Sequence, residues 1–289
     1  MGTMKLPRIE DNVQVKSSIW NALAEDIGAG DATTDALVTS SAKTTAQIVS
    51  RGSYVVSGST IGRAVFQRIC PELKVRILIP DGKKVKRNGT IMTISGPAGA
   101  ILSAERTALN FMQRMTGIAT LTASFVTKTR RFGTVILDTR KTTPGLRPLE
   151  KYAVLCGGGT NHRMGLDDMV LIKDNHRALW NQTQAGDLGM AVMKARMRNP
   201  ELAIEIEVEN EKELLSALHG QPECVLLDNM KPQLMRKCVL LCSGKCYTEA
   251  SGGITLENVE EVARTGVDSI SLGCLTHSAP AADLSLELK

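Results

Sequence analysis

A chain of 289 residues, with 43% hydrophobic and 22% charged residues, has the composition of a globular protein and can fill one large domain or two ordinary ones. The 35 Lys and Arg residues exceed the 30 Asp and Glu residues only slightly, and aromatic residues make up 3% of the chain. Because binding of single-stranded nucleic acid needs a basic groove with aromatic platforms, this composition argues against that class and remains compatible with small anionic substrates.

The N-terminal stretch MGTMKLPRIEDNVQ has no apolar core of signal-peptide length, and no later segment is apolar over the length needed to cross a membrane. Leu6 occupies the position where a myristoylation motif needs Ser or Thr. The sequence therefore predicts a cytosolic protein without a membrane partner.

The first third of the chain predicts an α+β domain. Residues 15–26 have the pattern of a helix, and the Gly- and Asp-rich residues 26–35 that follow predict a loop. Alternating, β-rich runs bounded by turn residues then predict strands at 44–58, 73–85 and 90–99. Residues 103–131 begin with Ser and an early Glu and carry apolar residues at helical spacing, which predicts a long helix.

From residue 134 onward, short apolar runs alternate with helical segments. The runs lie at 134–138, 169–174, 203–209, 224–229, 247–253 and 269–273, and the helical segments at 186–198, 211–220, 232–242 and 256–264. Strands that alternate with helices indicate a parallel sheet, and this number of repeats favours a barrel. The connection at 162–171 is less regular, so we expect an incomplete α/β barrel.

The seven cysteines form an odd number without a CxxC pair, which does not indicate a disulfide framework. Cys238, Cys242 and Cys246 recur every four residues, so a three-thiolate metal site is an alternative to buried reduced thiols. Gly244 is expected to end the helix before Cys246 joins the same face, which favours reduced thiols.

Polar, glycine-rich or ionisable residues follow every one of the predicted parallel strands. In a barrel these strand ends meet at one rim, where the loops build the active site. Ser251, Gly252, Gly253 and Gly273 come after the last two strands, where barrels often bind phosphate on backbone N–H groups. Glu207 and Asp228 are hard oxygen ligands suited to Mg²⁺, with pairing to a nearby Lys or Arg as the alternative.

The stretch TVILDTRKTTPGLRPLEKY, residues 134–152, introduces a cluster of cations. The candidates are Arg140, Lys141, His162, Arg163 and Lys173, from three segments of the chain. So much positive charge needs a partner with several negative charges, because the cations would otherwise repel one another in the folded site. His277 and His176 fit either a site role or a structural one. The residues alone thus predict a barrel enzyme that binds a phosphorylated ligand with Mg²⁺ and a second, polyanionic ligand.

Several segments together resemble one known family. DTRKTTPGLRPLEKYAV, GGGTNHRMGLDDMVLIKDNH, EIEVE, LLDN, ASGGI and GVDSISLGCLTHS are similar to quinolinate phosphoribosyltransferase, and so are the upstream segments EDIGAGDATTD and ILSAERTALNFMQRMTGIAT. The resemblance runs from about residue 25 to the C-terminus. Thr116 stands where the family usually has Ser, and both carry a hydroxyl.

The resemblance implies transfer of a phosphoribosyl group from phosphoribosyl pyrophosphate to quinolinate, with decarboxylation, to give nicotinate mononucleotide in NAD synthesis. It implies an N-terminal open-faced α/β sandwich over residues 1–115, an incomplete TIM-like barrel over 116–275, and a segment 276–289 that returns to the sandwich. It also implies a homodimer, with a hexamer as a larger alternative, in which Arg106 reaches the neighbour's active site.

The same resemblance implies a role for each candidate residue. The quinolinate site would contain Arg106, Thr139, Arg140, His162, Arg163 and Lys173. The phosphoribosyl pyrophosphate site would contain Lys141, Glu207, Asp228, Ser251, Gly252, Gly253, Leu272, Gly273 and His277. Lys141, Glu207 and Asp228 would be the catalytic residues, and Glu207 and Asp228 would hold Mg²⁺ directly or through water.

Three alternatives stay open from the sequence. A related phosphoribosyltransferase that uses nicotinate would leave some of Arg140, Arg163 and Lys173 unpaired. An aldolase barrel would use Lys141 or Lys173 as a Schiff-base nucleophile, which requires a desolvated lysine. A non-catalytic regulator that binds the donor on a similar barrel would not need Glu207 and Asp228.

Overall fold

The computed structural model describes residues 6–183 and 187–289, and the chain divides into two compact units. The first unit comprises residues 1–123, 141–159 and 274–289, and the second comprises residues 124–140 and 160–273. Helix α4, Ala98–Thr129, begins in the first unit and ends in the second. The segment 141–159 groups with the first unit, whereas the sequence placed it inside the barrel, because its helix α5 packs against other elements of that unit.

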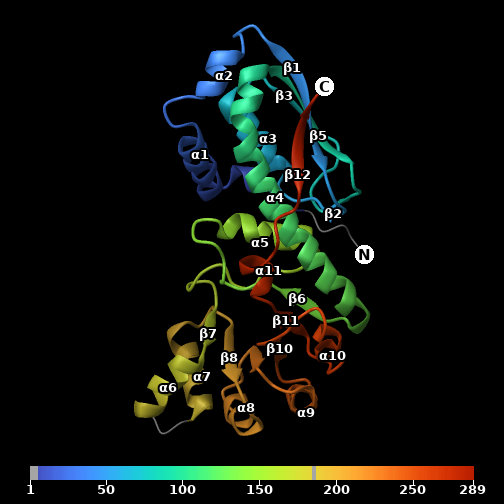
Figure 1. The fold of residues 1–289 in the computed structure, drawn as a ribbon. Coiled ribbons are helices and arrows are strands. Elements are labelled where there is room, and N and C mark those ends of the chain that lie inside the picture. The colour runs from blue at the N-terminus through green and yellow to red at the C-terminus, as the bar shows by residue number, and fades with distance from the viewer. Residues whose placement is uncertain (1–5, 184–186) are drawn as a thin grey trace. The chain divides into compact units, whose positions relative to one another are not determined.

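The first unit is built on an antiparallel sheet with the strand order β12-β1-β5-β3. Its strands are β1 Lys43–Ser50, β3 Lys74–Ile77, β5 Thr90–Pro97 and β12 Leu284–Leu288, and a separate pair consists of β2 Tyr54–Val55 and β4 Lys84–Val85. The C-terminal strand β12 (red in Figure 1) lies beside β1 (blue) and pairs with it, Ile48 opposite Leu286. The C-terminal strand thus joins a sheet whose other strands lie within residues 43–97.

The first unit also contains helices. They are α1 Val13–Ile27, α2 Ala32–Leu37, α3 Ser59–Ile69, the first part of α4, α5 Arg147–Cys156 and α11 Cys274–His277, with the short turn η1 Ile9–Asp11. Helix α3 approaches α4 closely because Gly62 has no side chain, since a Cβ there would lie 2.5 Å from the sulfur of Met112. The predicted α/β domain is confirmed at this level.

The predicted loop at 26–35 is wrong in its second half, where helix α2 begins. Asp31 is the N-cap of this helix, and its carboxylate accepts a hydrogen bond from the N–H of Thr34 at 3.0 Å. The Gly-rich residues before Asp31 form the loop, and Asp31 itself is the helix-start signal in the sequence.

The second unit contains a six-stranded sheet with the order β6-β11-β10-β9-β8-β7, and every neighbouring pair is parallel. The strands are β6 Val135–Leu137, β7 Val170–Ile172, β8 Ile204–Val208, β9 Cys224–Asp228, β10 Tyr247–Ser251 and β11 Ser269–Ser271. The helices are α6 Asp174–Thr183, α7 Leu188–Arg198, α8 Glu211–Leu218, α9 Pro232–Cys242 and α10 Val259–Ala263, with the turn η2 Arg130–Phe132. Figure 1 shows these helices along the strands in chain order.

The sheet of the second unit does not close, since β6 and β7 are its two edges in the described chain. Thr160 forms a parallel bridge with Leu137 at the β6 edge, and the irregular segment to β7 follows it. The strand order therefore agrees with the predicted incomplete barrel. Strand β8, with the sequence IEIEV, is buried along its whole length, including both of its glutamates.

All seven cysteines are free thiols, and Cys238 and Cys242 are buried in α9. The helix ends at Cys242, and Gly244 follows with a positive φ of 72°, so Cys246 lies outside the helix as predicted. In the described residues, no helix combines the length and the apolar character that a membrane-spanning segment needs.

Candidate active site

The C-terminal ends of the parallel strands in the second unit carry most of the candidate residues. They are Thr139 and Arg140 after β6, Lys173 after β7, Glu207 in β8, Asp228 in β9, Ser251 in β10 with Gly252 and Gly253, and Leu272 and Gly273 after β11. Because parallel neighbours place these ends on the same edge, segments separated by more than 100 residues contribute to one rim.

Two guanidinium groups lie close enough to repel each other at this rim. Burial, followed by the charge of Arg140, lowers the pKa of Arg163. Arg163 donates one hydrogen bond to the carbonyl of Met169 at 2.9 Å, while the buried Nε of Arg140 has no hydrogen-bond partner among the described residues. An anion with two oxygen acceptors would satisfy these donors and remove the repulsion.

Two carboxylates face a lysine on the neighbouring part of the rim. Burial raises the pKa of Glu207, and the negative charge of Asp228 raises it further. Lys173 has the opposite effect, because its ammonium nitrogen lies 3.7 Å from the Glu207 carboxylate. Two oxygen ligands whose charges destabilise each other fit a hard divalent cation such as Mg²⁺, which usually shares its other ligands with water and substrate phosphates. The donor set thus fits the expected metal.

The glycine turn after β10 depends on missing side chains. Gly252 and Gly253 have positive φ values of 89° and 60°. A Cβ on Gly252 would lie 2.2 Å from the side-chain oxygen of Asn229. The absence of a side chain at Gly252 therefore makes room for Asn229 and also leaves the backbone of the turn accessible. Asn229 in turn donates a hydrogen bond to the Asp228 carboxylate at 2.7 Å. The turn after β10 therefore helps to orient the carboxylate at the end of β9.

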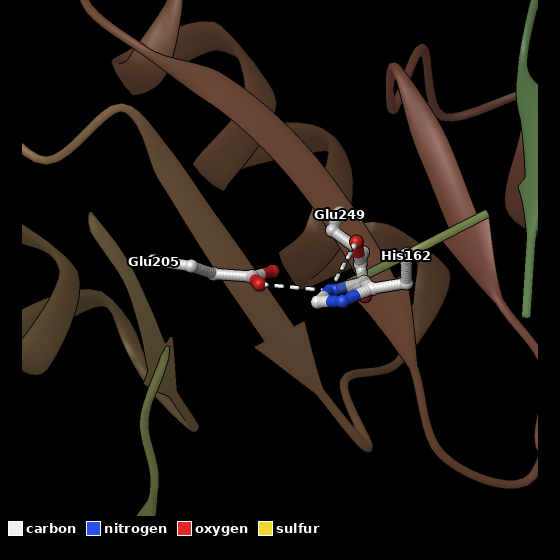
Figure 2. Close-up of side chains that lie close together, drawn as sticks. All are labelled: His162, Glu205 and Glu249. Atoms are coloured by element: carbon white, nitrogen blue, oxygen red, sulfur yellow. Dashed lines mark hydrogen bonds and ion pairs between the residues drawn. The ribbon is translucent and has the colours of Figure 1, made fainter. Parts of the chain in front are cut away.

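Just below the rim, His162 lies between two buried glutamates (Figure 2). Its Nε2 is 2.9 Å from Glu205 in β8 and 3.6 Å from Glu249 in β10. These three residues are spaced closely enough to hold a metal ion. A proton on Nε2, donated to Glu205, satisfies the same pair without an ion.

The protonation state of His162 follows from its other nitrogen. The backbone N–H of Arg163 donates to Nδ1 at 2.8 Å, so Nδ1 carries a lone pair and the imidazole is neutral. The sequence predicts His162 as one of the clustered cations, whereas its side chain is only 9% exposed and lies against Glu205. Burial, and next the charge of Glu205, raises the pKa of Glu249 to about 8.

We predict that Glu249→Gln makes the protein more stable at alkaline pH. A carboxyl whose folded pKa is raised contributes stability below its ordinary pKa of 4.5, and this contribution is lost as the pH rises toward about 8. Over that window the free energy of unfolding of the parent falls by up to about 1.4 kcal/mol per pH unit through this group. Gln copies the neutral form, so denaturant unfolding from pH 5 to 9 should show a flatter dependence. An equally steep curve for the variant would contradict a neutral Glu249.

Three candidates lie in the first unit. Arg106 is exposed on α4 and makes no ion pair within the described residues, while Thr107 and Ala108 beside it are buried. Lys141 is exposed, and its carbonyl accepts a hydrogen bond from Thr276 at 2.8 Å. Since Thr276 precedes His277 in α11, this bond brings the backbone of Lys141 and the helix of His277 together.

Sequence reasoning did not assign roles to three buried acids of the second unit: Asp138, Glu205 and Glu249. Asp138, fully buried at the end of β6, accepts hydrogen bonds from the N–H of His162 at 2.9 Å and from the side chain of Asn161 at 2.6 Å. Carboxylates within short, otherwise apolar strands are the signal that could have found them, because burial of such groups is costly without partners.

Comparison with family models identifies both parts of the chain. Residues 31–116 match the quinolinate phosphoribosyl transferase N-terminal domain, and residues 118–287 match the quinolinate phosphoribosyl transferase C-terminal domain. Together these matches cover most of the sequence.

Relatives and solved structures agree with the family models. The chain is 39% identical to a probable carboxylating nicotinate-nucleotide pyrophosphorylase of Bacillus subtilis, over 96% of this chain and 94% of the relative. It is 39% identical to the chloroplastic carboxylating nicotinate-nucleotide pyrophosphorylase of Arabidopsis thaliana, over 98% and 85%. The structure of the nicotinate-nucleotide pyrophosphorylase from Francisella tularensis matches with a TM-score of 0.91 and 36% identity, over 99% of this chain and 100% of that chain.

Proposed function

We propose that this chain, which belongs to the quinolinate phosphoribosyltransferase family, transfers the phosphoribosyl group of phosphoribosyl pyrophosphate to quinolinate. The products are nicotinate mononucleotide, pyrophosphate and carbon dioxide, as in NAD biosynthesis. The observation that carries the proposal is the pair Arg140 and Arg163, two partly buried guanidiniums close enough for the charge of Arg140 to lower the pKa of Arg163. Quinolinate, with its two carboxylates, provides negative charge for this pair.

The candidate residues divide between the two substrates. Arg140, Arg163 and Lys173 bind the carboxylates of quinolinate, with Thr139 beside them and His162 below. Lys141 binds the phosphoribosyl donor, whose 5′-phosphate is held by Ser251, Gly252, Gly253, Leu272, Gly273 and His277. Positive φ values at two of these glycines support close approach of a phosphate to the backbone.

Glu207 and Asp228 would hold Mg²⁺, directly or through water, and the bound ion would supply positive charge opposite the pyrophosphate. The same two carboxylates accept hydrogen bonds from the ribose hydroxyls and stabilise positive charge that develops on the ribose ring. No covalent nucleophile is required, because orientation and electrostatic stabilisation supply the catalysis. After transfer the pyridine nitrogen is quaternary, so the ring accepts the electron pair that carbon dioxide leaves behind.

The geometry favours this activity over a Schiff-base aldolase. The side chain of Lys173 is 46% exposed and lies 3.7 Å from the Glu207 carboxylate, so its amine lacks the desolvation that a Schiff-base nucleophile requires. Borohydride treatment with carbonyl compounds is therefore expected to give no covalent adduct.

The assembly is a homodimer in this proposal, with a hexamer as the larger alternative. Arg106 acts on the active site of the neighbouring subunit, which is consistent with its exposure and its lack of an ion pair in the described chain. The cytosolic location stays a prediction, since the Arabidopsis relative is named chloroplastic.

The test is an assay of the purified protein with Mg²⁺ and phosphoribosyl pyrophosphate, with quinolinate and nicotinate as parallel acceptors. We expect nicotinate mononucleotide and pyrophosphate from quinolinate, none from nicotinate, and loss of activity when EDTA removes the metal. Product from nicotinate alone would keep the phosphate site and overturn the dicarboxylate clamp. If neither acceptor reacts while the donor binds, the chain is a donor-binding protein without this activity.

A further inference from the structure

We infer that Glu205 is a positioning residue, which fixes the backbone of Arg163 through the ring of His162. This inference rests on the proposed function, because Arg163 is taken there to bind quinolinate. It adds a residue to the site that touches neither substrate and lies wholly within the second unit.

The contacts form a continuous path from strand β8 to the quinolinate site. The Glu205 carboxylate accepts a hydrogen bond from Nε2–H of His162 at 2.9 Å. Nδ1 of the same ring accepts a hydrogen bond from the backbone N–H of Arg163 at 2.8 Å. The ring is thus held at both nitrogens. Its orientation determines where the peptide of Arg163 lies, and the peptide determines where the guanidinium begins.

The backbone on the other side of His162 is anchored independently. Asp138 accepts the N–H of His162 at 2.9 Å and the amide of Asn161 at 2.6 Å. The short loop is therefore tied to β6 by its backbone and to β8 by the histidine ring. With two anchors, a loop in an irregular connection gains the rigidity that a substrate-binding residue needs.

Glu205 is a better anchor than its neighbour Glu249. Figure 2 shows the two carboxylates reaching Nε2 from different directions, with Glu205 at 2.9 Å and Glu249 at 3.6 Å. A single proton on Nε2 serves the nearer acceptor.

The burial of Glu205 supports a specific role. Glu205 is 1% exposed, and the residues on either side of it in strand β8, Ile204 and Ile206, are fully buried. An apolar side chain would fill this position without the cost of placing a carboxylate in a low-dielectric interior. The hydrogen bond to His162, the positive charge of nearby Arg163 and a weak contact with the thiol of Cys224 at 3.6 Å offset this cost.

The experiment compares Glu205→Leu with Glu205→Gln, which keeps an oxygen acceptor for Nε2. Without the acceptor the ring turns toward Glu249, the peptide of Arg163 moves, and the KM for quinolinate should rise between about 10- and 100-fold. Glu205→Gln should stay within about threefold of the parent. The KM for the phosphoribosyl donor should stay within about threefold in both variants.

Two further variants separate positioning from general damage. Glu249→Leu removes a carboxyl of similar burial from the other side of the ring and should leave the KM for quinolinate within about threefold of the parent. Val225→Ala opens the fully buried core of the neighbouring strand β9 and should lower the melting temperature without raising that KM selectively. Equal KM changes for both substrates, or no change in Glu205→Leu, would overturn the inference.

A measurement without substrate keeps the inference testable if Glu205→Leu does not fold. The chain has only four histidines, so ¹⁵N-labelled imidazoles can be assigned by comparison with His162→Asn. We expect His162 to be neutral with its proton on Nε2 in the parent and in Glu205→Gln. A proton on Nδ1 would overturn the inference whether or not the enzyme uses quinolinate, whereas an inactive parent with the expected tautomer would contradict only the proposed function.

Discussion

Replacement of Arg163 by Ala is expected to raise the KM for quinolinate by roughly 100-fold, while the protein remains as stable as its parent. Removing one member of a buried charged contact costs about 2–5 kcal/mol of binding, and 100-fold corresponds to about 2.7 kcal/mol. The free protein loses one hydrogen bond to Met169 and the attraction of Arg163 to two nearby carboxylates, but it also loses the repulsion between Arg163 and Arg140. These effects oppose each other. Steady-state kinetics and thermal unfolding of the same preparation test both parts.

Two controls give this result its meaning. Arg163→Lys keeps the charge but not the fork of donors, so it should recover only part of the affinity. Arg196→Ala removes a guanidinium of the second unit that pairs with Glu223 at 2.7 Å outside the rim, and it should leave the KM unchanged. A similar rise in the KM for the phosphoribosyl donor in Arg163→Ala would show that Arg163 does not serve quinolinate alone.

The repeated alternation of apolar runs and helical segments was sufficient to predict the parallel strands of the second unit. Strands of a parallel sheet are buried on both faces, so they appear in the sequence as short apolar runs between helices. Helix α2 was missed, since its six residues carry no apolar period and only the N-cap Asp31 marks its start. The assignment of α5 to the first unit was also beyond the sequence, because it depends on packing between segments far apart in the chain. Local patterns define elements, whereas their grouping is a tertiary property.

The site shows the same division between local and tertiary information. Strand ends such as Glu207 and Asp228 could be found because parallel strands place their C-terminal ends on one edge. The role of Glu205 could not, because nothing in the sequence pairs it with His162, which is 43 residues away along the chain. Its tautomer depends in addition on one backbone N–H, that of Arg163. Charge in a sequence thus predicted an anion site, but the protonation of its members required coordinates.

Arg106 provides the second large effect, because the proposed dimer divides each active site between two chains. Arg106→Ala and Arg140→Ala should each lose most of the activity, on the order of 100-fold or more, since a charged contact to substrate disappears in every site. In a mixture that has exchanged subunits, half of the dimers contain one chain of each kind. One of their two sites then has both arginines, so about a quarter of all sites are intact in a symmetric dimer.

We therefore expect the exchanged mixture to recover up to about one quarter of the parent activity, while each variant alone stays inactive at the same concentration. Refolding the two chains together, or slow exchange at low protein concentration, provides the mixture. The matched control is a mixture of Arg76→Ala chains with Arg140→Ala chains, since Arg76 lies in strand β3 and is not a site candidate. In this mixture only the active Arg76→Ala chains contribute, in proportion to their amount. If Arg106 acted within its own chain, each site would draw both arginines from the same chain. Every site would then lack either Arg106 or Arg140, and mixing would recover nothing. Recovery thus requires that the exposed Arg106 side chain contacts the substrate in the active site of the neighbouring subunit. A single chain cannot supply this contact.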